Sequence, residues 1–303
     1  MFDVQYERQT ELLLRLLPAL EEHPCFALKG GTAINLFVRD MPRVSVDIDL
    51  TYLPIKPRTE TLEEISESLH AFACSSLGRI PNANVHEHHS QGYLIRATCE
   101  TPEATIKIEP NTVLRGTIYP SVVLDLAETA RQRFGLYARV RTLSTADLYG
   151  GKLCAALDRQ HPRDLFDVKL LLEEEGITPE IRRAFVIYLA SHNRPMHELL
   201  SPNLKDISAA FETQFVGMTE EPVDIVDLVE IQRRLPEELV SQLDEDERSF
   251  LLSMKRAEPE WTRLGIDHLE QLPALQWKLQ NIQKMGPAKR REMLELLERT
   301  LAN

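Results

Sequence analysis

The chain has 303 residues, with 35 Lys and Arg against 47 Asp and Glu, and a formal net charge of −12. Hydrophobic residues make up 43% and charged residues 27%. This composition is typical of a globular protein with a sizeable core, and the length favours two domains of about 150 residues each. The acidic sum argues against a protein that wraps duplex DNA by bulk charge, although a local basic channel remains compatible with it.

Membrane and secreted classes are also disfavoured. No apolar run approaches the ~20 residues of a membrane span, and the N-terminal segment lacks the basic region and cleavage site of a signal peptide. The cysteines are widely spaced, with no CxxC pair, which is typical of reduced thiols. We therefore expect a cytoplasmic protein with no membrane segment, disulfide framework or cysteine zinc site.

The first half of the chain mixes helical and strand patterns. Leucines at i, i+3, i+4 and i+7 spacing predict an amphipathic helix near the N-terminus, and strict alternation predicts a strand before residue 54. In chain order we expect a helix over 6–23, an apolar strand over 25–28, a short helix over 33–38, a strand over 44–53, a helix over 61–73, strands over 93–99 and 104–109, and helices over 143–158 and 163–174.

After Gly176 the strand patterns disappear. Apolar periodicity instead predicts helices over 178–191, 224–242, 244–257, 268–281 and 287–301. The sequence therefore indicates an α+β protein, with a mixed-sheet domain over 1–175 and an all-helical C-terminal domain over 176–303.

Two acidic residues on one predicted strand give the strongest chemical signal. Asp47 and Asp49 are one residue apart, so the period of a strand places both carboxylates on one face. Two such carboxylates repel unless a cation lies between them, and Mg²⁺ or Mn²⁺ bound with substrate phosphates suits that position. Just upstream, Gly30, Gly31 and Thr32 allow a tight turn whose backbone amides can approach a phosphate. A solvated surface pair is the alternative interpretation of these two acids.

Three segments resemble a known family. KGGTAINL over 29–36, RVSVDIDL over 43–50 and LSTADLYGGKLCAALDRQHPRDLFDV over 143–168 are similar to the AbiEii/AbiGii nucleotidyltransferase toxins, within the DNA polymerase β-like superfamily. The resemblance implies a nucleotidyltransferase domain, an NTP substrate, a divalent metal and a partner antitoxin. It is weak or absent after residue 176.

The resemblance also implies roles for the first two segments. The turn would hold the nucleotide phosphates, and the acidic pair would bind the metal. A third acid on a neighbouring strand would complete the metal site or act as the general base, and Glu109 in TIKIEPN matches that place, with a surface strand glutamate as the alternative. The residues concerned are Lys29, Gly30, Gly31, Thr32, Asp47, Asp49 and Glu109.

The third segment adds a basic and acidic group. Lys152 has no acidic neighbour four residues away on its own helix, so we expect its charge to meet nucleotide phosphates. Arg159 follows two turns later on the same face, and Arg163 comes soon after. Asp164 and Asp167 match acids that the family needs for activity, and the alternative is a salt-bridge network that locks two helices together.

Ser45 precedes the acidic pair on the same strand face. Some relatives carry a serine here that an antitoxin phosphorylates, and the added negative charge would hinder nucleotide binding. We keep this as a hypothesis, together with a nucleotide-binding role for the residue. The histidines of HEHHS over 86–90 look like metal ligands, but their spacing favours a surface loop. Trp261 and Trp277 are expected to pack between helices.

The charge of the chain is unevenly distributed. Residues 131–163 carry seven basic and two acidic side chains, whereas residues 206–247 carry thirteen acidic and two basic ones. The basic strip suits a triphosphate or an RNA backbone. The acidic stretch is either a solvated helix surface, a surface that repels nucleic acid, or a docking surface for a basic antitoxin.

The resemblance implies a Mg²⁺-dependent toxin that transfers an NMP from an NTP to RNA, with the tRNA 3′ end favoured, in a toxin–antitoxin or phage-defence system. Nucleotidyl transfer to a protein hydroxyl and a non-catalytic binding module are the alternatives. Labelled NTPs with tRNA or protein lysate separate the first two, and loss of toxicity on Asp47→Ala and Asp49→Ala would exclude the third.

Overall fold

The computed structural model describes residues 1–302, which pack as two compact units. Unit 1 comprises residues 1–148 and 216–222, and unit 2 comprises residues 149–215 and those from 223 onward. The division falls within a single helix, α5 (Thr145–Arg159). The domain boundary expected near residue 175 stays a prediction.

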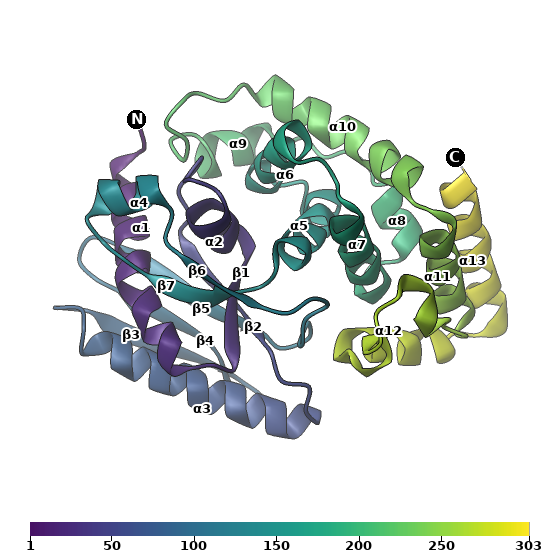
Figure 1. Ribbon diagram of the computed structural model, residues 1–303, viewed down its shortest axis with the longest axis horizontal. Coiled ribbons are helices and arrows are strands. Elements are labelled where there is room, and N and C mark those ends of the chain that lie inside the picture. The colour runs from purple at the N-terminus through teal and green to yellow at the C-terminus, as the bar shows by residue number, and fades with distance from the viewer. Residues whose placement is uncertain (303) are drawn as a thin grey trace. The chain divides into compact units, whose positions relative to one another are not determined.

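Unit 1 is built on a mixed seven-stranded sheet with the order β3-β4-β5-β2-β1-β7-β6 (Figure 1). Two neighbouring pairs, β1 with β7 and β2 with β5, are parallel, and the other pairs are antiparallel. The strands are β1 (Phe26–Lys29), β2 (Asp47–Tyr52), β3 (Asn84–Ser90), β4 (Tyr93–Glu100), β5 (Thr105–Asn111), β6 (Val122–Asp125) and β7 (Arg139–Thr142).

The central strands of this sheet separate an apolar face from a polar one. Ile48 of β2 lies opposite Ile108 of β5, and both are fully buried. Tyr52, on the same face of β2, donates its hydroxyl hydrogen to Glu64 of α3 (Arg58–Leu77) at 2.5 Å. Figure 1 shows α3 lying along β3 and β4, which it contacts. The alternation of β2 therefore buries its even positions and leaves Asp47 and its odd-numbered neighbours for the polar face.

The helices of unit 1 begin and end where capping and proline allow. Asp3 caps α1 by accepting from the Gln5 amide at 2.7 Å. This helix gives way to a 3₁₀ helix at Pro18, which lacks the amide that an α-helix needs, so the expected single helix over 6–23 is divided. The remaining elements are α1 (Val4–Leu16), the 3₁₀ helix Leu17–Glu22, α2 (Gly30–Ala33), the π-helix Ile34–Val38 and α4 (Glu128–Phe134).

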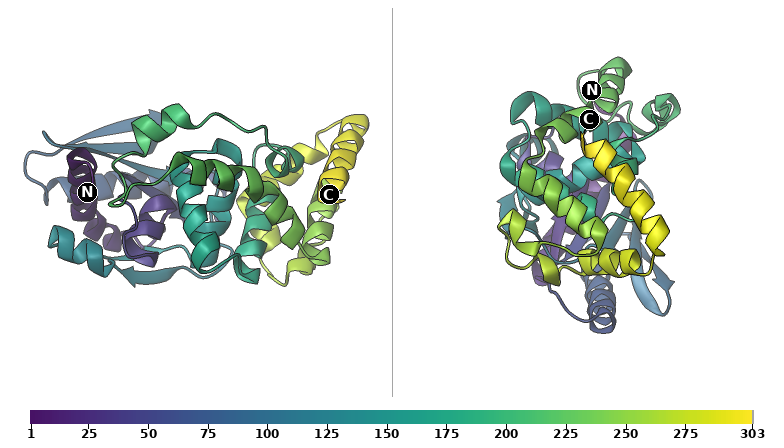
Figure 2. Two further views of the ribbon diagram at one scale, coloured as in Figure 1. Left: turned by 90° about the horizontal axis from the view of Figure 1, so that it is seen from above. Right: turned by 90° about the vertical axis from the view of Figure 1, so that its right-hand side faces the viewer.

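In the part that the structure describes, unit 2 is made of helices without named strands. Figure 2 shows its helices, among which α10 contacts α6, α12 contacts α7, and α13 contacts α11. Besides the end of α5 they are α6 (Pro162–Glu174), α7 (Pro179–Ser191), α8 (Met196–Leu200), α9 (Ser208–Gln214), α10 (Ile225–Gln242), α11 (Glu245–Arg256), the 3₁₀ helices Trp261–Leu264 and Leu269–Gln271, α12 (Pro273–Gln283) and α13 (Pro287–Ala302). The α+β fold with a helical C-terminal region is confirmed. None of the helices within 1–302 is both long and apolar enough to span a membrane.

Several local expectations were wrong. The HEHHS segment is not a loop, because it forms most of β3, an exposed edge strand paired with β4. The hairpin of β6 and β7 with α4 between them was missed, since these elements have four to seven residues and little apolar alternation. Trp261 packs against Phe250, as expected for interhelix packing, but Trp277 is 52% exposed.

Candidate functional site

The turn after β1 presses its backbone against the acidic pair of β2. Gly30 has a φ of +71°, in the left-handed region that favours glycine. A Cβ atom at this position would lie only 2.7 Å from Oδ2 of Asp49. Glycine is therefore needed here both for its conformation and for the close approach to a carboxylate.

A buried arginine lies behind the next residue of the turn. A Cβ atom on Gly31 would be 2.5 Å from Nη2 of Arg43, a residue that is only 2% exposed. Nη1 of Arg43 donates to the carbonyl oxygen of Val44 at 2.9 Å. This side chain places a fixed positive charge next to a turn suited to phosphates. Arg43 opens the RVSVDIDL segment, but its position in the sequence did not predict this role.

Hydroxyl groups fasten the turn to the start of β2. The Thr32 hydroxyl hydrogen-bonds with the Ser45 hydroxyl at 2.8 Å and with the Asp47 carbonyl oxygen at 2.5 Å. The Thr10 hydroxyl of α1 lies 3.1 Å from the Ser45 carbonyl oxygen. Thr32 and Ser45 are 1% and 5% exposed. Ser45 thus lies beneath the turn, where it supports the turn through Thr32.

The acidic pair lies on the polar face of the sheet, as predicted. Asp47 and Asp49 are both partly exposed, whereas Ile48 between them is fully buried. Strand pairing puts Lys29 of β1 opposite Asp49, with Glu109 of β5 on its other side. The same register puts Lys107 opposite Asp47. Three carboxylates and two lysines therefore share one face of three neighbouring strands.

Glu109 does not join the acidic pair. Its Oε1 atom lies 2.5 Å from Nε of Arg96 on β4. Within residues 1–302, no three His, Cys, Asp or Glu side chains gather closely enough to hold a metal ion, and this includes the HEHHS histidines. The two aspartates nevertheless suit one hard divalent cation, which takes carboxylate oxygens and completes its shell with water and phosphate oxygens.

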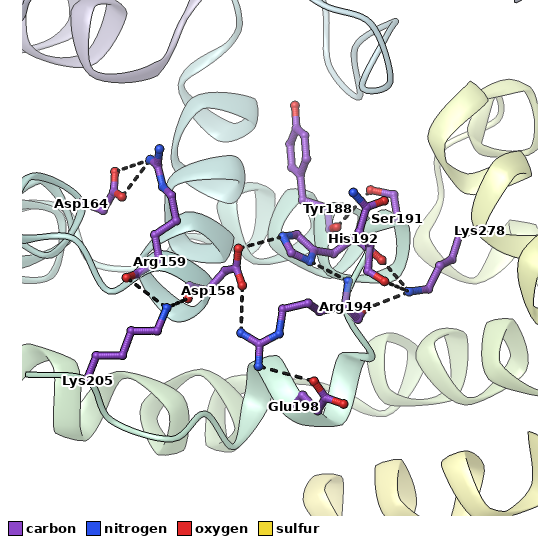
Figure 3. Close-up of polar contacts among 11 residues, drawn as sticks. Asp158, Arg159, Asp164, Tyr188, Ser191, His192, Arg194, Glu198, Lys205 and Lys278 are labelled. Carbon is purple, nitrogen blue, oxygen red and sulfur yellow. Dashed lines mark hydrogen bonds and ion pairs between the residues drawn. The ribbon is translucent and has the colours of Figure 1, made fainter. Parts of the chain in front are cut away.

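A second group of predicted residues lies inside unit 2. Nζ of Lys152 on α5 is 2.9 Å from a carboxylate oxygen of Asp164 and 2.9 Å from one of Asp167, both on α6. Arg159 reaches Asp164 at 2.8 Å, and Figure 3 shows that contact. The side chains of Lys152, Asp164 and Asp167 are 6%, 3% and 0% exposed.

The expectation that the Lys152 charge is available to phosphates was wrong. Its acidic partners come from the next helix rather than from its own, so helical spacing did not reveal them. Burial raises the pKa of Asp164, but Lys152 and Arg159 outweigh burial and hold that pKa below its ordinary value. The network locks α5 to α6 while Arg159, 62% exposed, keeps most of its side chain in solvent.

A further polar network in unit 2 was not predicted at all. Asp158 at the end of α5 pairs with Arg194 at 2.8 Å, and His192 lies 3.8 Å from the same carboxylate (Figure 3). Lys278 of α12 donates to the carbonyl oxygens of His192 and Arg194 at 2.5 and 2.9 Å. Burial, with a contribution from the charge of Lys255, lowers the pKa of Lys278 to about 8. These contacts tie the end of α7 to α5 and α12.

The basic strip over 131–163 is largely neutralised by acids from outside it. Arg131 pairs with Glu128, Arg133 with Glu7, and Arg139 approaches Asp125 at 3.8 Å. Lys152 and Arg159 are held by the carboxylates of α6. The net positive charge of residues 131–163 is therefore a property of the sequence, and these side chains do not form an open basic surface. By itself the strip supports no RNA site.

The predicted site residues thus form two groups, each described within its own unit. The turn and the acidic pair meet in unit 1, while the Lys152 network lies in unit 2. The two groups differ in burial. The amino-acid sequence shows only indirectly which of these side chains are buried.

Comparisons with known proteins agree with the fold and the motifs. A search of curated proteins gives no match. The chain is similar to a solved structure of MenT4, a nucleotidyltransferase toxin from Mycobacterium tuberculosis H37Rv, with a TM-score of 0.60 and 16% identity over 98% of this chain and 92% of that one. The model of the family described as nucleotidyl transferase AbiEii toxin, type IV toxin–antitoxin system, matches residues 11–281. Because that match spans most of its length, the chain belongs to the AbiEii family of nucleotidyltransferase toxins of type IV toxin–antitoxin systems.

Proposed function

We propose that this nucleotidyltransferase transfers an NMP from an NTP to a hydroxyl of RNA, with the tRNA 3′ end as the favoured acceptor, and so blocks translation. The observation that supports the proposal is the close approach of the Gly30 turn to Asp49, because a backbone suited to phosphates then lies beside a carboxylate suited to a metal ion. The experiments that identify the acceptor start from this turn and this carboxylate.

In the proposed reaction, the acceptor hydroxyl oxygen forms a bond to the α-phosphorus, and the bond from that phosphorus to the bridging oxygen breaks to release pyrophosphate. Mg²⁺ or Mn²⁺, when bound, would neutralise charge on the phosphates. Asp47 and Asp49 would hold it, and the amides of Gly30 and Gly31 would orient the triphosphate. Once Arg96 releases it, Glu109 would complete the metal site or accept the hydroxyl proton.

The proposal keeps Lys152, Asp164 and Asp167 as residues that transfer needs, but as positioning residues. Their mutual neutralisation fixes α5 against α6. Within unit 2, the exposed Arg159 would be the member of this group that meets phosphates, with Arg163 as a second candidate. Within unit 1, Lys29 beside the turn is a separate candidate for phosphate contact.

Toxicity implies a cognate antitoxin, and we propose that the pair acts in the cytoplasm, where NTPs and tRNA are found, with phage defence as one context. Ser45 remains a candidate for modification by the antitoxin. Because Ser45 is 5% exposed and bonded to Thr32, its phosphorylation would require the turn to open. Mass analysis of protein co-expressed with its antitoxin would test this, and full neutralisation with unmodified Ser45 would exclude it.

The acceptor can be identified by incubating the purified protein with each α-³²P-labelled NTP and bulk tRNA, in parallel with a protein lysate. We expect label in the RNA, sensitive to ribonuclease and dependent on Mg²⁺. Label that resists ribonuclease and is removed by protease would instead support nucleotidyl transfer to a protein hydroxyl. The Asp49→Asn variant is the negative control, and Asp125→Asn, an exposed aspartate on β6, is the matched control.

A further inference from the structure

The contact between Arg96 and Glu109 suggests a role for a residue outside the family-like motifs. The pairing of β2 with β5 puts Glu109 directly beside Asp49, within reach of the acidic pair. Glu109 nevertheless directs an oxygen to Arg96, 2.5 Å away. The third carboxylate is therefore close to the metal-binding pair and engaged by a cation of the chain itself.

Backbone pairing explains why Arg96 reaches this place. β4 pairs with β5 in an antiparallel register, with Ala97 opposite Ile108 and Thr98 opposite Lys107. The next pair in that register brings Arg96 opposite Glu109. The two side chains thus share the polar face, on adjacent strands, and their contact is fixed by the sheet rather than by a long flexible reach.

Exposure makes this contact easy to exchange. The side chains of Arg96 and Glu109 are 40% and 41% exposed, so water reaches both groups, although the Nε atom of Arg96 at the contact is covered. Exposed ion pairs shift equilibria by less than about tenfold. A divalent cation bound at the neighbouring aspartates attracts a carboxylate more strongly than one guanidinium does, because it carries twice the charge.

We propose that Arg96 is a positioning residue that acts as a replaceable counter-ion of Glu109. Without metal, Arg96 neutralises one of three neighbouring carboxylates and limits their repulsion. When a divalent cation binds at Asp47 and Asp49, the Glu109 carboxylate leaves Arg96 and turns to the metal site. The guanidinium of Arg96 then becomes available to a phosphate of the substrate. Arg96 therefore sets the metal affinity. This inference rests on the proposed metal-dependent function.

The test measures Mn²⁺ binding by the purified full chain. The readout is the loss of the free Mn²⁺ signal in electron paramagnetic resonance. Arg96→Gln should tighten Mn²⁺ binding by about three- to tenfold, because the metal no longer competes with the guanidinium. Glu109→Gln should weaken binding. In the Glu109→Gln background, Arg96→Gln should have no further effect, since the carboxylate for which they compete is gone.

Lys107→Gln is the matched control, since it removes one positive charge from the same face while leaving the Arg96 pair intact. If Arg96→Gln and Lys107→Gln tightened Mn²⁺ binding equally, the effect would come from general electrostatics, and the inference would be overturned. An Arg96→Gln effect that persists without Glu109 would also overturn it. If the wild-type chain bound no Mn²⁺ even with an NTP present, this result would contradict the proposed metal-dependent function. It would therefore also contradict the inference about Arg96. Circular dichroism of each variant checks folding.

Discussion

Two pairs of aspartates in this molecule have similar spacing and opposite surroundings. Asp47 and Asp49 of unit 1 are partly exposed and lie on a strand face beside a glycine turn. Asp164 and Asp167 of unit 2 are buried on a helix and both bind the same lysine. Solvent reaches the first pair, whereas the second is buried around the cation of Lys152.

Burial therefore distinguishes the pair that we propose to bind the metal from the pair that forms an internal ion network. In the second group two cations meet two carboxylates, and Lys152 is buried among them while Arg159 keeps most of its side chain in solvent. A buried ion network does little for stability relative to a well-packed apolar core, yet removing one member leaves an expensive uncompensated charge. The two pairs should accordingly respond to mutation in opposite ways.

The largest effect is expected at the exposed pair. Asp47→Asn or Asp49→Asn should lower nucleotidyl transfer by about 10³-fold or more, because metal stabilisation of phosphate charge contributes several kcal/mol. The melting temperature should change little, because both side chains are partly exposed. Initial rates with labelled NTP and growth arrest on expression measure the loss, with Asp125→Asn as the matched control. Transfer that survives in both variants would show that the acids are merely surface residues.

The buried pair should instead affect stability. Lys152→Met removes the cation shared by Asp164 and Asp167 and should cost about 3–5 kcal/mol of unfolding free energy, measured in urea. A compensating change, Asp167→Leu in the Lys152→Met background, should recover much of this loss because it removes a carboxylate as well. Recovery of stability without recovery of transfer would show that Lys152 also serves the reaction, and recovery of both would show a purely structural network.

The sequence predicted the acidic pair and its sheet because their signals are local. Alternation around Ile48 and the motif order around Gly30 both lie within about 20 residues. The pairing of Lys152 with acids of the next helix depends on how α5 meets α6, which helical spacing does not encode. Arg96 was missed for the same reason, since its contact with Glu109 follows from strand register.

Short elements were missed for a different reason. β6 and β7 have four residues each, and β6 is largely exposed, whereas β7 buries only Val140 and Thr142, which is too short an alternation to mark a strand. β3 is an edge strand with an almost wholly exposed surface, and its histidine-rich composition resembles that of a loop. Pairing with β4, rather than burial, makes it a strand.

A smaller, pH-dependent effect should sharpen the contrast. The pKa of Asp164 is below its ordinary value in the folded chain, since Lys152 and Arg159 outweigh the effect of burial. A lowered folded pKa means that its contribution to stability is present above the unfolded pKa of about 3.9 and is lost as the pH falls through the folded value. The stability difference between the wild type and Asp164→Asn should be constant from pH 8 to 5 and shrink below about pH 4. A difference that grows in acid would contradict this sign.

The smallest expected effect tests a buried group within the exposed site. Ser45→Ala removes one hydroxyl that bonds with Thr32 beneath the turn and should cost about 1 kcal/mol of unfolding free energy. Because the Thr32 hydroxyl keeps its bond to the Asp47 carbonyl oxygen, the turn should hold its place and transfer should fall by less than tenfold. Thr32→Val, which loses both bonds, should cost more. If Ser45→Ala abolished transfer without changing stability, the Ser45 hydroxyl would contact the nucleotide itself. The proposed division between exposed groups that bind ligand and buried groups that support them would then fail at this residue.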